Sequence, residues 1–112
     1  MTIKQYQEVV EHWIKRYGIR YFEVRTNALL LVEEVGELSR LIARQYGEQS
    51  FKDSTKPVDV KKAIADEMTD ILFVLTCLAN QMDIDLTEAI TFNMNKKSER
   101  DAQRHYNNDK LL

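Results

Sequence analysis

Residues 29–41, LLLVEEVGELSRL, decide the fold, because they combine the apolar stripe of a helix with carboxylates that interrupt it. At 3.6 residues per turn, one helix face carries Leu30, Glu34, Glu37 and Leu41. Glu33 lies at the edge of the same face. Acidic residues at the centre of an otherwise apolar face are unusual, since ionised groups are rarely buried without a partner.

A second stretch, residues 65–78, ADEMTDILFVLTCL, repeats this arrangement. Its helix face carries Ala63, Glu67, Asp70 and Val74. Residues three positions apart lie about 60° apart around a helix, so two facing antiparallel helices could present four carboxylates to one point. The two stripes contain no Lys or Arg, and Arg40 and Arg44 lie off the acidic stripe. A divalent metal would relieve the repulsion, and oxygen ligands favour Mg²⁺, with Mn²⁺ as a substitute.

The composition indicates one helical domain spanning residues 1–112, with a C-terminal tail from about residue 106 that we expect to be flexible. Its 112 residues include three glycines and one proline, which favours long helices with few turns. A net charge of −2 argues against a nucleic acid polymer as partner. Because the chain shows neither a signal core nor an apolar run that could cross a bilayer, we expect a soluble cytoplasmic protein without a membrane partner. The single cysteine, Cys77, fits a buried apolar position.

Apolar spacing and capping residues predict four helices, and hence an all-α fold. The first begins at Ile3 and ends at Gly18; the second is capped by Thr26 or Asn27 and ends at Gly47. Asp59 is the predicted N-cap of the third helix, which reaches about Met82 and whose centre must be covered on most sides by other helices or a second subunit. Asp85 is the predicted N-cap of the fourth, with Leu86, Ile90 and Met94 as its buried stripe.

Two further groups are candidates for substrate binding. Lys96, Lys97 and Arg100 form a cationic strip that could hold phosphate, although a solvated face with Lys97 paired to Asp101 would look the same in the sequence. Trp13 belongs to an aromatic stripe with Tyr6 and Tyr17, which could stack on a nucleobase or be part of the core.

The segments LVEEVGEL, DEMTDILFVLTCLAN and DIDLTEA resemble the MazG-like nucleoside triphosphate pyrophosphohydrolases of the all-α NTP pyrophosphatase superfamily. The resemblance extends from about Trp13 to Tyr106. It implies a four-helix core that oligomerises through its helices as a homodimer or homotetramer, Mg²⁺ dependence, and hydrolysis of an NTP or dNTP to the monophosphate and diphosphate. Its implied role is the removal of unwanted nucleotides.

Carried over by position, the resemblance implies the metal ligands Glu34, Glu37, Glu67 and Asp70. Glu33 and Glu34 become the candidates for activating the attacking water. The run MNKKSERD is similar to the basic signature after the fourth helix in this family, with Asp101 holding Arg100 in place.

The sequence leaves two alternatives open. Related phosphoribosyl-ATP pyrophosphohydrolases and dUTP- or dCTP-type enzymes use similar acidic helices on another substrate. A non-catalytic oligomerisation or regulatory module could bind metal through the same carboxylates for structure alone.

Overall fold

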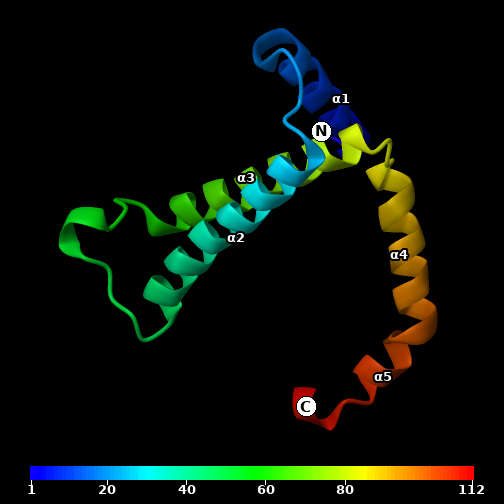
Figure 1. Ribbon diagram of the computed structural model, residues 1–112. Coiled ribbons are helices and arrows are strands. Elements are labelled where there is room, and N and C mark those ends of the chain that lie inside the picture. Colours follow the sequence, from blue (N-terminus) through cyan, green and yellow to red (C-terminus); the bar gives the residue numbers. More distant parts are fainter.

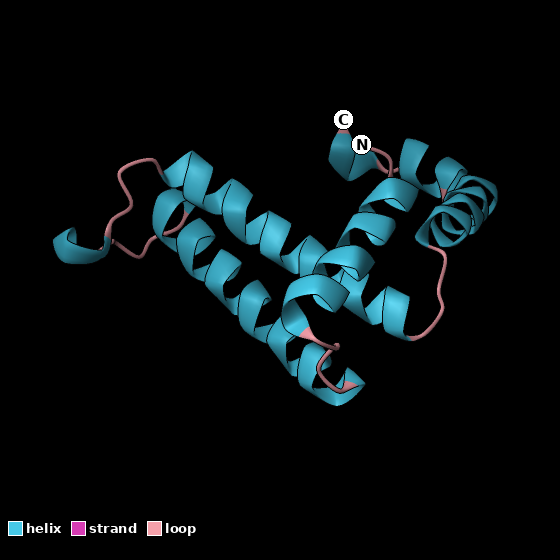
Figure 2. Ribbon diagram, turned by 90° about the horizontal axis from the view of Figure 1, so that it is seen from above, coloured by secondary structure: helices cyan, strands magenta, loops and turns pink.

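The computed structural model describes residues 1–112, and its longest feature is a pair of antiparallel helices, α2 (Val24–Tyr46) and α3 (Val60–Gln81), which lie side by side in Figures 1 and 2. The loop between them contains one turn of 3-10 helix, η2 (Asp53–Thr55). Gly47 ends α2 as predicted. A Cβ added there would lie 2.5 Å from the carbonyl oxygen of Ala43, so the position favours glycine. Asp59 caps α3, with its carboxylate accepting a hydrogen bond from the Lys62 amide at 3.0 Å.

Helix α1 (Ile3–Trp13) continues into a π-helical turn, η1 (Ile14–Gly18), and packs against α3. A capping box starts it, because Thr2 Oγ1 accepts from the Gln5 amide and Gln5 Oε1 accepts from the Thr2 amide. The small core at this contact contains Val10, Ile14 and Cys77, bordered by Tyr6, Tyr21 and Phe73. The burial predicted for Cys77 is confirmed.

The predicted N-cap of the second helix is wrong by three to four residues. Helix α2 begins at Val24, its N-cap is Glu23, and no side chain caps it. Asn27 is buried inside α2 instead, and its Nδ2 donates to Gln81 Oε1 at 2.8 Å. The amide that capping rules favour is thus used in a tertiary contact between α2 and α3, which the local pattern does not reveal.

A hydrogen-bonded junction fixes the start of α4 (Leu86–Arg100) on α1 and α3. Gln7 donates from Nε2 to Asn80 Oδ1 and to the Ile84 carbonyl, and its Oε1 accepts from the Leu86 amide. Asn80 donates from Nδ2 to the Gln7 carbonyl and to the Tyr21 hydroxyl. One glutamine and one asparagine therefore connect three helices.

Beyond this junction α4 runs away from the α2–α3 pair and leads into α5 (Ala102–Tyr106) and a final 3-10 turn, η3 (Asp109–Leu111), as Figure 1 shows. Asp85 caps α4 as predicted, by accepting from the Glu88 amide at 3.2 Å. The predicted burial of the α4 stripe is wrong for the single chain: Ile90 is 46% exposed and Met94 53% exposed. Leu86, at the start of the stripe and next to α1, is half-buried.

The chain is much more open than a compact monomer of its length. Its radius of gyration is 17.7 Å, whereas a compact chain of this length would have roughly 13 Å. Its accessible surface is 9183 Å², against roughly 6,400 Å² expected for a compact monomer of this mass. Leu72 and Leu75 on α3 contribute to this exposed apolar area, so α1 and α2 cover α3 on only part of its circumference. None of the helices is both long and apolar enough to cross a bilayer.

Candidate metal centre

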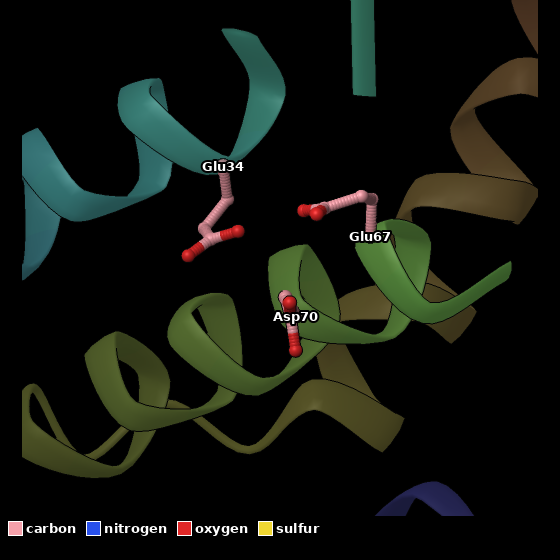
Figure 3. Close-up of side chains that lie close together, drawn as sticks. All are labelled: Glu34, Glu67 and Asp70. Carbon is pink, nitrogen blue, oxygen red and sulfur yellow. The ribbon is translucent and has the colours of Figure 1, made fainter. Parts of the chain in front are cut away.

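Three carboxylates from α2 and α3 converge between the two helices. Glu34 extends from α2 towards Glu67 of α3, and Asp70 lies one turn further along α3 (Figure 3). One oxygen from each of the three side chains lies within 4.8 Å of the others, and all three residues are half-buried. The antiparallel pairing of two helices with carboxylates at helical spacing produces this cluster, called the acidic cluster below.

Glu67 carries a buried carboxylate oxygen in the acidic cluster. Its Oε2 is buried and has no hydrogen-bond partner. Burial, together with the neighbouring carboxylate of Glu34, raises the pKa of Glu67 to about 7. A buried acceptor without a donor is costly. No Lys or Arg of the chain forms an ion pair with the cluster that would offset this cost.

The donors present fit a hard divalent cation. All of them are carboxylate oxygens, which Mg²⁺ and Mn²⁺ prefer, and the separation of the three oxygens allows one ion to contact them together. None of the ion pairs within the chain involves Glu34, Glu67 or Asp70. The orphaned oxygen of Glu67 is the observation that favours a bound cation over a solvated acidic face.

The two other acids predicted for this site lie outside the acidic cluster. Glu33 is exposed on α2. Glu37 is also exposed, and its Oε2 lies 3.7 Å from Nε of Arg40. The chain thus brings together three of the four predicted metal ligands and leaves the fourth beside an arginine. Gly36, between these acids, faces open space, since an added Cβ would meet nothing within 4 Å.

The cationic strip of Lys96, Lys97 and Arg100 lies on the C-terminal half of α4, which Figures 1 and 2 show diverging from the α2–α3 pair. Asp101 accepts from Nε of Arg100 at 3.3 Å and from Nη2 of Arg104 at 3.2 Å. Its hydrogen bond to Arg100 lowers the pKa of the Asp101 carboxyl. Asp101 holds Arg100 as expected, whereas the alternative pair of Lys97 with Asp101 does not form. The strip and the acidic cluster do not meet within one chain.

Trp13 contacts α3, the helix that carries Glu67 and Asp70. Its ring packs edge-on against Phe73, three residues beyond Asp70 on α3, with the ring centroids 5.8 Å apart. It remains 49% exposed. With Val9 and Arg16, the exposed side of Trp13 lines an open groove along α1. The Trp13 ring therefore packs against Phe73 on one side and is open to solvent on another.

Two features escaped the sequence analysis. Arg40 contacts Glu37 although it lies off the acidic stripe, and the spacing of three residues between an acid and a base was the available signal. The junction of Gln7 and Asn80 had a weaker signal, namely amide side chains beside apolar helix faces.

Comparisons with known proteins agree on one family. Residues 22–105 match the MazG nucleotide pyrophosphohydrolase domain. The chain is 38% identical over 103 residues to the Bacillus subtilis protein YpjD, covering 92% of this chain and 89% of that protein. It is 31% identical over 81 residues to dCTP pyrophosphatase 1 of Bos taurus, covering 72% of this chain but 47% of that protein.

Solved structures give the same result. The crystal structure of YpjD from Bacillus subtilis has a TM-score of 0.75 at 38% identity, covering 86% of this chain and 94% of that one. The crystal structure of the Bacillus-conserved MazG protein, a nucleotide pyrophosphohydrolase, has a TM-score of 0.74 at 34% identity, covering 92% of this chain and 96% of that one.

Proposed function

The chain belongs to the MazG nucleotide pyrophosphohydrolase family, and from this premise we propose that it hydrolyses a nucleoside triphosphate to the monophosphate and diphosphate with Mg²⁺ held by the acidic cluster. The observation that carries the proposal is the unpartnered oxygen of Glu67 between Glu34 and Asp70. Mn²⁺ is the expected substitute. The proposed role is removal of unwanted nucleotides in the cytoplasm.

Glu34, Glu67 and Asp70 would hold the metal, and Glu37 would be the fourth ligand once its side chain turns from Arg40 to the cluster. A divalent ion at this place would neutralise phosphate oxygens and lower the pKa of a bound water. Either Glu33 or Glu34, adjacent on α2, accepts the proton of the attacking water. Water adds to the α-phosphorus, the bond from this phosphorus to the bridging oxygen breaks, and diphosphate leaves with its charge compensated by cations.

The cationic strip of Lys96, Lys97 and Arg100 binds the phosphates from a second copy of the chain. Within one protomer α4 runs away from the acidic cluster, so the strip can reach such a cluster only in an oligomer. The surface in excess of a compact monomer is roughly 2,800 Å², which exceeds the roughly 800 Å² that one partner contributes to a stable interface. We therefore propose a homodimer, or a homotetramer built from such dimers, in which Ile90 and Met94 are covered.

Hydrolysis is tested with a panel of nucleoside triphosphates, including dCTP, dUTP and phosphoribosyl-ATP, while diphosphate and monophosphate are quantified. Asp70→Asn should abolish turnover with unchanged far-UV circular dichroism. Asp66→Asn is the matched control, because Asp66 is an exposed acid on the same helix. A protein that Mg²⁺ stabilises but that releases no diphosphate from any nucleotide would be a structural metal-binding module. The panel also separates the alternative substrates.

The contribution of a second copy is tested with mixed oligomers. Chains carrying Asp70→Asn and chains carrying Arg100→Ala are each expected to be inactive. A hybrid dimer restores one intact site if the strip acts on the partner's acidic cluster, because that site takes Asp70 from one chain and Arg100 from the other. Hybrids without activity, formed from chains that do associate, would place the strip and the cluster in the same chain.

A further inference from the structure

Glu37 is held by a cation instead of lying in the acidic cluster. Nε of Arg40 lies 3.7 Å from Glu37 Oε2, across about one helical turn of α2. Among the ion pairs of the chain, this is the one that involves a carboxylate predicted to bind metal. Arg40 therefore competes for the same carboxylate as the cation of the proposed site.

The pair of Glu37 and Arg40 is easy to separate. The Glu37 side chain is 52% exposed and that of Arg40 38% exposed. An exposed ion pair on a helix surface contributes little to stability, so separating it costs little. Glu37 also shares its helix face with Glu34 of the acidic cluster, one turn away. A side-chain rotation of Glu37 towards the cluster leaves the guanidinium of Arg40 without its partner.

We propose that Arg40 is a phosphate-binding residue. Without metal, Glu37 forms an ion pair with Arg40. When the Glu37 carboxylate turns to the metal, the guanidinium of Arg40 becomes free to bind phosphate. The inference rests on the proposed function and deepens it. The released guanidinium stays about one helical turn from Glu37 on α2, the helix that also carries Glu34. Its planar fork can donate two parallel hydrogen bonds to a phosphate group. Arg40 supplies this contact from the same chain as the cluster, in addition to the strip on α4.

The two roles predict opposite effects of one substitution. In Arg40→Gln, Glu37 loses its competing cation, so Mg²⁺ should bind about twofold tighter in the absence of nucleotide. The same variant loses a charged phosphate contact, so inorganic tripolyphosphate should bind about tenfold more weakly at saturating Mg²⁺. Arg40→Lys keeps the charge and should recover most of the tripolyphosphate affinity.

Both affinities are measured by isothermal titration calorimetry on the full chain, first with Mg²⁺ alone and then with tripolyphosphate. Arg44→Gln is the matched control, because Arg44 lies one turn further along α2 and donates to the Arg40 carbonyl instead of to an acid. It should leave both affinities equal to those of the wild type within the error of the titration. Circular dichroism checks the fold, and Arg40→Met, which keeps an apolar stem, replaces Arg40→Gln if the latter is unfolded.

The inference is overturned if the Arg40 variant binds Mg²⁺ no more tightly than the wild type, or binds tripolyphosphate equally well. It is also overturned if the wild type binds no tripolyphosphate at saturating Mg²⁺. Nucleotide hydrolysis by the wild type is measured separately. Its absence would refute the proposed function, whereas the two titrations judge Arg40 whatever the hydrolysis assay gives.

Discussion

Replacing Glu67 by glutamine should make the metal-free protein more stable at neutral and alkaline pH, although it removes a residue of the proposed site. In the metal-free chain, burial and the carboxylate of Glu34 raise the pKa of Glu67 from 4.5 to about 7. At about 1.36 kcal/mol per pKa unit this shift corresponds to roughly 3 kcal/mol, and we expect about 1–3 kcal/mol because the cluster is open to solvent on one side.

The sign follows from proton binding. Since the folded state holds the Glu67 proton up to a higher pH than the unfolded state does, the metal-free wild type should lose stability as the pH rises from about 4.5 to about 7. Glu67→Gln cannot lose this proton and should lack that component of the pH dependence. Below about pH 4.5 the two proteins should therefore differ little, and above about pH 7 the variant should be the more stable.

Urea unfolding followed by circular dichroism measures the difference, at several pH values with EDTA and again with Mg²⁺. Mg²⁺ should stabilise the wild type and have much less effect on Glu67→Gln, so the stability gap should close or reverse. Asp66→Asn removes an exposed charge on the same helix and should change the stability by less than about 0.5 kcal/mol. A Glu67→Gln protein that is less stable than the wild type in EDTA at about pH 8 would show that the acidic cluster is not strained without metal.

Four further outcomes are expected. Asn80→Ala should destabilise the protein by about 2 kcal/mol in urea unfolding, because it removes the part-buried hydrogen bonds of Asn80 with Gln7 and Tyr21. An effect no larger than that of the exposed control Gln103→Ala would contradict this role. Gly36→Ala should stabilise α2 by about 0.5–1 kcal/mol, since its added Cβ meets nothing within 4 Å. Gly47→Ala should destabilise the protein, because its Cβ would meet the Ala43 carbonyl. Equal free energies of unfolding for the two variants would refute the contrast. Ile90→Glu should dissociate the proposed dimer in sedimentation equilibrium. Thr87→Glu is the control, at an exposed polar position of α4. An unchanged mass of the Ile90→Glu protein would exclude this face of α4 as the interface. Trp13→Ala should raise KM for the nucleotide about tenfold with little change in kcat if the ring stacks on the base, and a change in stability without any change in KM would assign Trp13 to packing alone.

Local rules predicted the elements well where the deciding contacts lie within a few residues. Asp59 and Asp85 cap their helices, and Gly47 ends α2, because each of these contacts spans three or four positions of the chain. The same rules placed the start of α2 at Thr26 or Asn27 and were wrong, because Asn27 bonds to Gln81, 54 positions away. Capping propensity depends on neighbouring residues only, so it cannot predict a hydrogen bond to a residue far away in the sequence.

The sequence by itself determined that the chain is all-α and that Glu34, Glu67 and Asp70 lie on helix faces able to meet, because helical period and residue type are properties of the local chain. Only the tertiary structure decided which acids converge. Antiparallel packing brings three carboxylates within reach of one ion, while Glu37 pairs with Arg40. The direction of α4 was equally beyond the sequence, since Gln7 and Asn80 set it through hydrogen bonds between residues more than seventy positions apart. Helical periodicity assigns each side chain to a face, but the face that it meets depends on contacts that form only when distant segments pack together.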